Sequence, residues 1–433
     1  MHVVPTRYAS RGEAVGPVEG NPSRELRVEG GIVGEPCTVK VLHRGQNAIH
    51  ARWSASGTPS ALRRDPPCPH ARQVGGACGG CPWLHLTPDG ARDARREVVR
   101  EALRAVGLDI PVAPTVAGPE DAEGWRHVVK LVGWTDRRGR TRLGAFAPRS
   151  HDGVEIAGCM ALAPRLHAFT RLGALEVPAG VVRAVIARAS RSTRRVLATL
   201  VARADTAAVR AFARALPADG VYLHLHARDG DALTDPVGPL VHLRGDRTLE
   251  EAVGERSLAL GPLDFFQTNP GLAQRLWASL PRPAPGTDGV VRLVDLYAGA
   301  GAVSLALLGA AARGAEVLLV EENAGAVARG AATLRAAGAH VEAVGGRVGG
   351  ATLPDRFRGA LVVANPPRSG FEPGVVARLA ALAPSALALV SCHPDALARD
   401  LAALVAAGFS VERVTPFDMF PGTPHVEVVA VLG

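Results

Sequence analysis

Apolar and polar residues alternate with a period of two along the first 58 residues of the chain. The alternation is evident at residues 26–28, 37–42 and 47–53, and glycines separate these segments. Such alternation between turn residues predicts short strands, and several short strands in a small module favour a β-barrel of the OB type. Barrels of this type often bind single-stranded RNA, and an accessory barrel without that role is the alternative. Residues 57–69, rich in Ser, Pro and Arg, predict a linker.

The pattern changes to a helical period between Thr87 and Val106, where Thr-Pro-Asp supplies a start signal. Four arginines give this helix a basic face that is either solvated or in contact with RNA: Arg92, Arg95, Arg96 and Arg100. Further on, residues 124–134 and 142–152 alternate like two paired strands, and Asp136-Arg-Arg-Gly-Arg140 predicts the turn between them. Residues 165–255 favour an α+β layer.

From about Leu258 onward, apolar strand-like runs alternate with Ala-rich helical segments, which is typical of a parallel sheet. A chain of 433 residues is long enough for several domains. The patterns therefore predict an α/β protein with three domains. These are an OB-like β-barrel at 1–58, an α+β central domain at 59–255 and a Rossmann-like domain at 256–433.

The charge of the chain favours a polyanionic partner. The formal net charge is +8, and arginine supplies nearly all the positive charge because lysine occurs only at Lys40 and Lys130. Arginine offers planar forks for phosphate and a face on which bases stack. The first residues lack the apolar run of a signal peptide, and no segment predicts a membrane span. We therefore expect a cytoplasmic monomer, in which clustered cysteines indicate a metal or catalysis rather than disulfides.

Three cysteines lie close together, at Cys68, Cys78 and Cys81, and two glycines separate the last pair. A Cys-x2-Cys with glycines between lets the backbone wrap around an ion or a cluster. A fourth thiolate is needed, and Cys159 is the best candidate. Spacing alone leaves zinc and a [4Fe–4S] cluster both open.

A Gly-rich turn follows the strand predicted at 291–296, in the sequence Asp295-Leu-Tyr-Ala-Gly299-Ala-Gly301. Its glycines permit close approach of a nucleoside-bearing ligand, and Glu321, at the end of the next strand, suits ribose hydroxyls. The third glycine of the dinucleotide fingerprint is replaced by Ser304. This combination favours an S-adenosylmethionine site, with an ordinary Gly-rich turn as the alternative.

Three further motifs end or begin strands near the C-terminus. Asn365-Pro-Pro-Arg368 would aim side chains and carbonyls from a rigid loop. Cys392 follows a buried strand, and Glu427 begins the last one. A thiol and a carboxylate at one cleft would form a nucleophile and a proton acceptor, although each residue alone is more often structural.

Taken together, these motifs resemble the bacterial RNA uracil-C5-methyltransferases, in the ribosomal branch that has an iron–sulfur cluster and a TRAM barrel. The resemblance spans nearly the whole chain and implies methylation of a uridine in structured RNA, with 23S rRNA favoured and a tRNA T-loop uridine second. It implies S-adenosylmethionine and a [4Fe–4S] cluster as cofactors. The implied roles are Cys392 as nucleophile and Glu427 as base, with Gln267, Tyr297, Gly299, Glu321 and Asn365 at the cofactor and base site, and Cys68, Cys78, Cys81 and Cys159 as cluster ligands.

The chain departs from the family pattern at three places. Asn365 stands where the family usually has Asp, Ala302 replaces a polar residue after the Gly-rich turn, and the spacing from Cys68 to Cys78 is enlarged. An amide at 365 can still accept a hydrogen bond from uracil N3–H. Two other function classes remain: an Asn-Pro-Pro amino-group methyltransferase, in which Arg368 would replace the usual aromatic residue, and a non-enzymatic RNA-binding or iron–sulfur chaperone protein.

Overall fold

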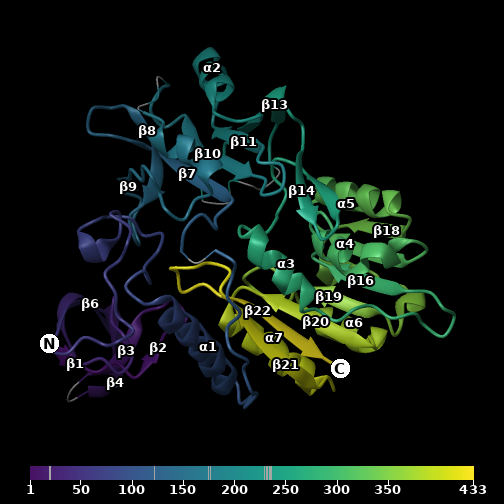
Figure 1. Cartoon of the computed structure of the whole chain (residues 1–433), viewed down its shortest axis with the longest axis horizontal. Helices are drawn as coiled ribbons and strands as arrows, with labels where there is room; N and C mark the ends of the chain where they lie inside the picture. The colour runs from purple at the N-terminus through teal and green to yellow at the C-terminus, as the bar shows by residue number, and fades with distance from the viewer. Residues whose placement is uncertain are drawn as a thin grey trace. The chain divides into compact units, whose positions relative to one another are not determined.

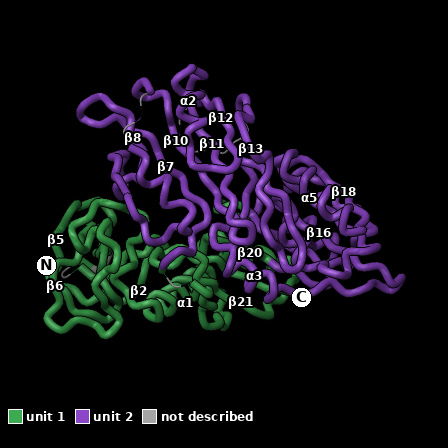
Figure 2. The backbone as a smooth tube through the Cα atoms, turned by 45° about the horizontal axis from the view of Figure 1, so that its top comes forward, with its two compact units in different colours: residues 1–122, 367–370, 389–432 green, residues 123–366, 371–388, 433 purple. Residues whose placement is uncertain are grey.

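The computed structural model describes residues 1–18, 21–120, 122–173, 175, 177–228, 230, 233 and 237–433. The chain divides into two compact units (Figure 2). The first contains residues 1–122, 367–370 and 389–432, and the second contains residues 123–366, 371–388 and 433. Figure 1 gives the labels of the helices and strands.

The N-terminal residues form a six-stranded sheet in the order β1-β5-β6-β4-β3-β2. Its pairs are antiparallel except for the parallel pair β4–β6. The apolar positions of the alternating pattern form its core, with Leu26, Val28, Ile49 and Ala51 almost fully buried. The predicted β module is therefore confirmed as a sheet, while its OB or TRAM type stays a prediction. The strands are β1 (His2–Val3), β2 (Arg7–Tyr8), β3 (Ala14–Val18), β4 (Asn21–Glu29), β5 (Cys37–Arg44) and β6 (Ala48–Ser56).

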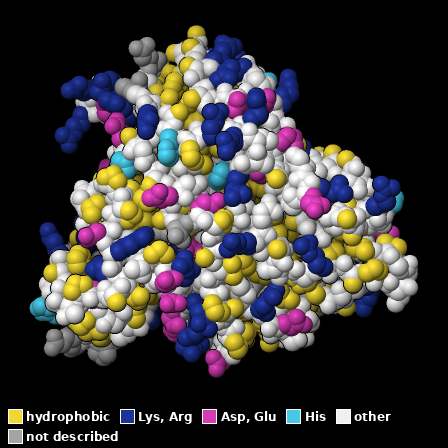
Figure 3. Space-filling model, in the orientation of Figure 1, with side chains coloured by type: hydrophobic (Ala, Val, Ile, Leu, Met, Phe, Trp, Pro, Cys, Tyr) yellow, Lys and Arg dark blue, Asp and Glu magenta, His cyan; other side chains and the backbone are white. Residues whose placement is uncertain are grey.

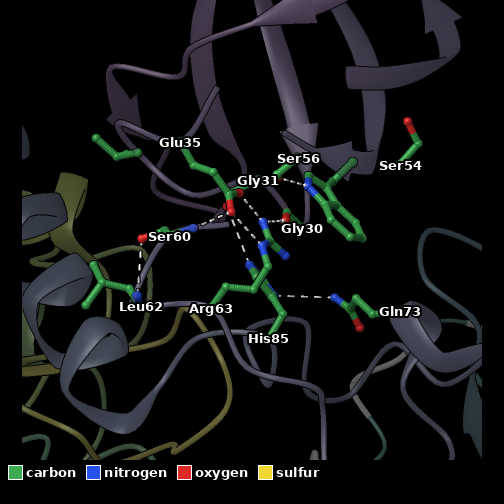
Figure 4. Close-up of polar contacts among 12 residues, drawn as sticks. Gly30, Gly31, Glu35, Ser54, Ser56, Ser60, Leu62, Arg63, Gln73 and His85 are labelled. Carbon is green, nitrogen blue, oxygen red and sulfur yellow. Dashed lines mark hydrogen bonds and ion pairs between the residues drawn. The ribbon is translucent and has the colours of Figure 1, made fainter. Parts of the chain in front are cut away.

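The segment after this sheet is not a free linker. Arg63 pairs with the buried Glu35 through its Nε and Nη2, and its Nη2 also donates to the Gly30 carbonyl at 3.0 Å (Figure 4). The backbone N–H of Ser60 donates to the same carboxylate at 3.0 Å, and the guanidinium lies 4.3 Å above the Trp53 ring. The prediction of a linker missed this anchor, because Ser, Pro and Arg content says nothing about a partner carboxylate.

Helix α1 (Pro88–Ala105) matches the predicted helix, and the Thr87 side chain caps it by accepting from the Gly90 N–H. Its apolar residues pack with Trp83, Leu86 and the N-terminal sheet. The prediction of an accessible basic face on this helix is wrong for one residue, because Arg95 is completely buried. The polar–apolar pattern assigned it to the surface because arginine is rarely buried without partners.

The second unit contains a seven-stranded central sheet in the order β13-β12-β11-β10-β7-β8-β9. The predicted hairpin is confirmed, because β7 and β8 pair antiparallel with Thr135 opposite Thr141. Its elements are β7 (Val128–Thr135), β8 (Thr141–Phe146), β9 (Gly153–Val154), β10 (Val182–Ala189), β11 (Val196–Ala202), α2 (Ala207–Ala215), β12 (Gly220–Leu225) and β13 (Leu240–Gly245). A two-stranded sheet of β14 (Leu249–Val253) and β15 (Arg256–Leu260) follows.

The C-terminal sheet has seven strands in the order β18-β17-β16-β19-β20-β22-β21. Strand β16 pairs in parallel with both β17 and β19, so the order reverses at β16, and such a switch point is where open α/β sheets bind ligands. The strands are β16 (Arg292–Leu296), β17 (Glu316–Glu321), β18 (His340–Gly345), β19 (Leu361–Ala364), β20 (Ala386–Ser391), β21 (Val411–Phe417) and β22 (Glu427–Leu432). The helices are α3 (Pro270–Ala278), α4 (Ala302–Leu308), α5 (Ala324–Ala336), α6 (Val375–Leu382) and α7 (Pro394–Ala406).

These sheets confirm the predicted α/β fold class. The exact domain limits at 58 and 255 stay a prediction. None of the helices that the structure describes has both the length and the apolar character needed to cross a bilayer.

Candidate active site

The Gly-rich turn leaves β16 directly at the switch point. Leu296, the last residue of β16, pairs with Ala364, the last residue of β19. Tyr297 and Asn365 are therefore the first residues after two neighbouring strands. The Asn365 N–H donates to the Leu296 carbonyl at 3.2 Å. Tyr297 has φ of +61°, a left-handed conformation that is strained for a residue with a side chain. Strain of this kind concentrates at ligand sites, which agrees with the predicted role of this turn.

Glu321 fixes the shape of the same turn from the end of β17. Its Oε2 accepts from the Gly299 N–H at 2.9 Å, and its Oε1 accepts from the Asn323 N–H at 2.8 Å. The prediction assigned Glu321 to ribose hydroxyls, and a carboxylate that accepts two bonds still has lone pairs for that purpose. Gln267, the remaining predicted residue here, is buried before α3.

Asp295 is a buried acidic residue at the start of the turn that the site prediction left out. The Ser304 hydroxyl donates to its Oδ2 at 2.6 Å, and burial raises the pKa of this carboxyl to about 7. The signal was present, because Asp295 opens the D-x-x-x-G-x-G motif and Ser304 occupies the position of the missing third glycine. The pair fastens the start of α4 to the end of β16.

The first unit holds the two predicted catalytic residues. Cys392 lies between β20 and α7, half-buried, and Glu427 is the buried first residue of β22. Burial is the largest cause that raises the pKa of the Cys392 thiol, and the nearby Glu427 charge raises it further. Burial also raises the pKa of Glu427 to about 8. The thiol and the carboxyl therefore interact electrostatically, which is the arrangement expected of a nucleophile and a base at one site.

Arg368 is a positively charged residue that opposes the rise in the pKa values of Cys392 and Glu427. The site prediction did not include it. The positive charge of Arg368 lowers the pKa of both Cys392 and Glu427, and a side-chain hydrogen bond adds to this lowering for the pKa of Cys392. The residue itself is exposed. In the sequence, Arg368 was recognised only as the end of the Asn365-Pro-Pro-Arg368 motif and as the residue that replaces the aromatic one of amino-group methyltransferases. A positive charge beside a cysteine activates a thiol, but 24 positions separate Arg368 from Cys392, so the sequence does not show that they are close.

The cysteine segment has a backbone suited to thiolates. Cys68 is buried, the Cys78 N–H donates to the His70 carbonyl at 3.0 Å, and the Gly80 N–H donates to the Cys78 sulfur at 3.3 Å. Hydrogen bonds to sulfur are a common feature of cluster ligands. No group of three or more His, Cys, Asp or Glu side chains that could hold a metal is found among the described residues. Cys159 belongs to the second unit, and the four-cysteine set stays a prediction.

Comparison with known proteins identifies the family. The family model of tRNA (uracil-5-)-methyltransferases matches residues 346–433. A 23S rRNA (uracil(1939)-C(5))-methyltransferase RlmD of Halomonas elongata is 34% identical over 94% of this chain and 84% of its own length. The chain belongs to the RNA uracil-C5-methyltransferase family. It is therefore an S-adenosylmethionine-dependent enzyme that methylates uracil C5 in RNA, and this membership excludes the non-enzymatic alternative and disfavours the amino-group one.

Two further relatives agree with this membership. An uncharacterized RNA methyltransferase of Gloeobacter violaceus, gll3134, is 30% identical over 94% of this chain and 91% of its own length. The tRNA (uracil-54, C5)-methyltransferase of Pyrococcus abyssi, solved with S-adenosyl-L-homocysteine, has a TM-score of 0.74. That match covers 100% of this chain and 99% of the Pyrococcus abyssi chain at 22% identity. It shows that the two proteins share one fold.

Proposed function

We propose that this methyltransferase modifies a uridine of 23S rRNA, with Cys392 as nucleophile and Glu427 as base. The observation that carries the proposal is that Cys392 directly follows β20 and Glu427 begins β22, the neighbouring strand of the sheet, and that each is also influenced by the charge of Arg368. The rRNA target is supported by the relative from Halomonas elongata, whose name specifies 23S rRNA.

The chemistry explains why a thiol and a carboxylate are both required. Uracil C5 is a weak nucleophile, so the Cys392 thiolate first adds to C6 and turns the ring into an enolate. C5 would then attack the sulfonium methyl group that S-adenosylmethionine supplies, the bond from this methyl group to sulfur would break, and S-adenosylhomocysteine would leave. Glu427 removes the C5 proton, the C5–C6 double bond reforms, and the C6–S bond breaks to release the thiolate. A carboxyl with a pKa of about 8 is close to the operating pH and is a competent base for this step.

The remaining residues of the proposal bind the cofactor, the base and the cluster. Asn365 would contact uracil N3–H and O4. The cofactor would be held by Gln267, Tyr297, Gly299 and Glu321, and the [4Fe–4S] cluster by Cys68, Cys78, Cys81 and Cys159. The cluster would have a structural role, because methyl transfer involves no redox step.

The RNA partner is also supported by charge. Dark blue lysine and arginine side chains are spread over the face in Figure 3, with acidic side chains between them. Binding to RNA through phosphates should weaken steeply with salt. A flat dependence of RNA affinity on salt would contradict phosphate contacts.

The test uses 23S rRNA and tRNA that contain 5-fluorouridine, with anaerobically purified enzyme and S-adenosylmethionine. Fluorine cannot leave as a proton, so the enzyme should stall as a covalent adduct on a denaturing gel. The Cys392→Ala variant should form no adduct. An adduct with tRNA alone would move the target to the T-loop, and no adduct with either RNA would refute the covalent mechanism.

A further inference from the structure

Arg95 on helix α1 is completely buried. Its guanidinium pairs with Asp418 at 3.0 Å. Its Nε donates to the His425 carbonyl at 3.0 Å, and its Nη2 donates to the carbonyls of Phe420 and Thr423 at 3.1 and 2.5 Å. Four contacts of one side chain thus converge on residues 418–425.

Residues 418–426 join β21 to β22 without forming a helix or a strand, and they end at Glu427. Most of this segment is buried, so its carbonyls need partners inside the protein. Arg95 donates hydrogen bonds to three of these carbonyls. A fourth contact comes from the cysteine segment, where the Trp83 N–H donates to the Gly422 carbonyl at 2.9 Å.

The side chain at position 95 has to be arginine for this purpose. Burying a charge costs several kcal/mol unless a counter-ion and hydrogen bonds compensate it. Arg95 meets this requirement with Asp418, with the segment carbonyls and with the Ala91 carbonyl of its own helix at 3.1 Å. Lysine has three donors on a single nitrogen, whereas the guanidinium of Arg95 spreads its donors over Nε, Nη1 and Nη2, which here reach separate carbonyls. The contacts therefore fix the path of the segment as well as neutralising a charge.

We propose that Arg95 is a positioning residue for Glu427, because it holds the segment that carries the base into the active site. The inference rests on the proposed role of Glu427. The His425 carbonyl, which Arg95 holds, lies two residues before the base. A small displacement of a catalytic group has a large effect on rate.

The order of the chemical steps makes this role separable from folding. Addition of Cys392 to C6 and methylation of C5 precede any action of the base. In the last step the C5–H bond breaks, the proton passes to Glu427, and the electron pair reforms the double bond as the thiolate leaves. A misplaced base therefore slows only this step, and the methylated covalent adduct should persist on ordinary RNA.

The experiment compares Arg95→Lys and Arg95→Gln with wild type and Glu427→Gln, on ordinary RNA and on 5-fluorouridine RNA. We expect adduct formation with the fluorinated RNA to stay within about threefold of wild type. With ordinary RNA, turnover should fall by about 10- to 100-fold, a loss typical of a displaced general base. The methylated adduct should persist on the gel, as for Glu427→Gln.

Arg244 offers a matched control in the central sheet. Its guanidinium likewise donates to three carbonyls of one segment, those of Arg214, Leu216 and Ala218 at 2.7–2.8 Å. Arg244→Lys should leave no persistent adduct on ordinary RNA. If that variant accumulates as much adduct as Arg95→Lys, the effect is a general one of lost carbonyl partners, and the proposal is wrong.

Other outcomes are equally decisive. Folded Arg95 variants that turn over normally, or that lose adduct formation on both RNAs in parallel, would overturn the proposal. Should both Arg95 variants unfold, Asp418→Asn removes only the ion pair and should give the same persistent adduct more weakly. Normal turnover of that variant would then assign Arg95 to folding alone. Absence of any adduct with wild-type enzyme and fluorinated RNA would instead refute the proposed function.

Discussion

Replacement of Arg368 by glutamine should slow the attack of Cys392 on RNA. Burial and the Glu427 charge both raise the pKa of the thiol, and the Arg368 charge and hydrogen bond oppose them. A hydrogen bond to a charged group contributes about 1.5–3 kcal/mol, and exposure of Arg368 to solvent puts its contribution at the lower end. A loss of about 1.4 kcal/mol would reduce the thiolate population about tenfold.

The assay is the rate of adduct formation with 5-fluorouridine RNA, under single-turnover conditions with saturating RNA. Saturation removes any contribution of Arg368 to RNA affinity. Near pH 7 the Arg368→Gln variant should react about tenfold more slowly than wild type, because only the thiolate attacks. At higher pH the two rates should converge as both thiols ionise.

Arg368→Lys is the control, since it keeps the positive charge and loses the planar fork. It should retain much of the wild-type rate if charge dominates. A constant ratio between Arg368→Gln and wild type across the whole pH range would refute the reasoning. Arg368 would then act on the geometry of the RNA complex and leave thiol ionisation unchanged.

Three further predictions follow from the site and its surroundings. Because burial raises the pKa of Glu427 to about 8, release of methylated product should accelerate with pH up to about 8 and then level off, as a pH series of single-turnover product formation would show. In Gly330→Ala, the added Cβ would lie 2.6 Å from the Ala300 carbonyl oxygen, so calorimetry should find S-adenosylmethionine bound at least tenfold more weakly; unchanged affinity would contradict a rigid turn. Burial lowers the pKa of His85 to about 4, so the folded protein resists its protonation and stability should be lost as pH falls from 6.5 towards 4, by up to about 3 kcal/mol. Denaturant midpoints of His85→Gln should lack that part of the pH dependence.

The sequence predicted elements whose signals are local. Thr87 indicated the start of α1, because threonine is a favourable N-cap residue. The alternation of apolar and polar residues on both sides of Asp136 predicted the hairpin of β7 and β8. The Gly-rich turn was recognised because glycine spacing and a strand-end acid are both visible in a linear pattern. These features depend on residues that are close together along the chain.

The sequence failed where a residue depends on distant partners. Arg95 matches the solvated side of an amphipathic helix, and the carbonyls that bury it lie more than 300 residues away. Arg63 belongs to a segment with the composition of a linker, yet it neutralises the buried Glu35. The periodicity of a helix predicts which face a residue lies on. It does not predict which backbone carbonyls of a distant segment will need a hydrogen-bond donor.

This use of arginine changes what the net charge of +8 means. Arg63, Arg95 and Arg244 direct their guanidinium groups at carboxylates and backbone carbonyls of the protein itself. Arginines whose guanidinium groups are paired inside the protein do not neutralise phosphates, so they release few counter-ions from RNA when it binds. The slope of RNA affinity against salt should therefore be smaller than the arginine content suggests. The phosphate contacts must come from arginines that remain exposed, whereas the buried Arg95 has the proposed role of positioning Glu427.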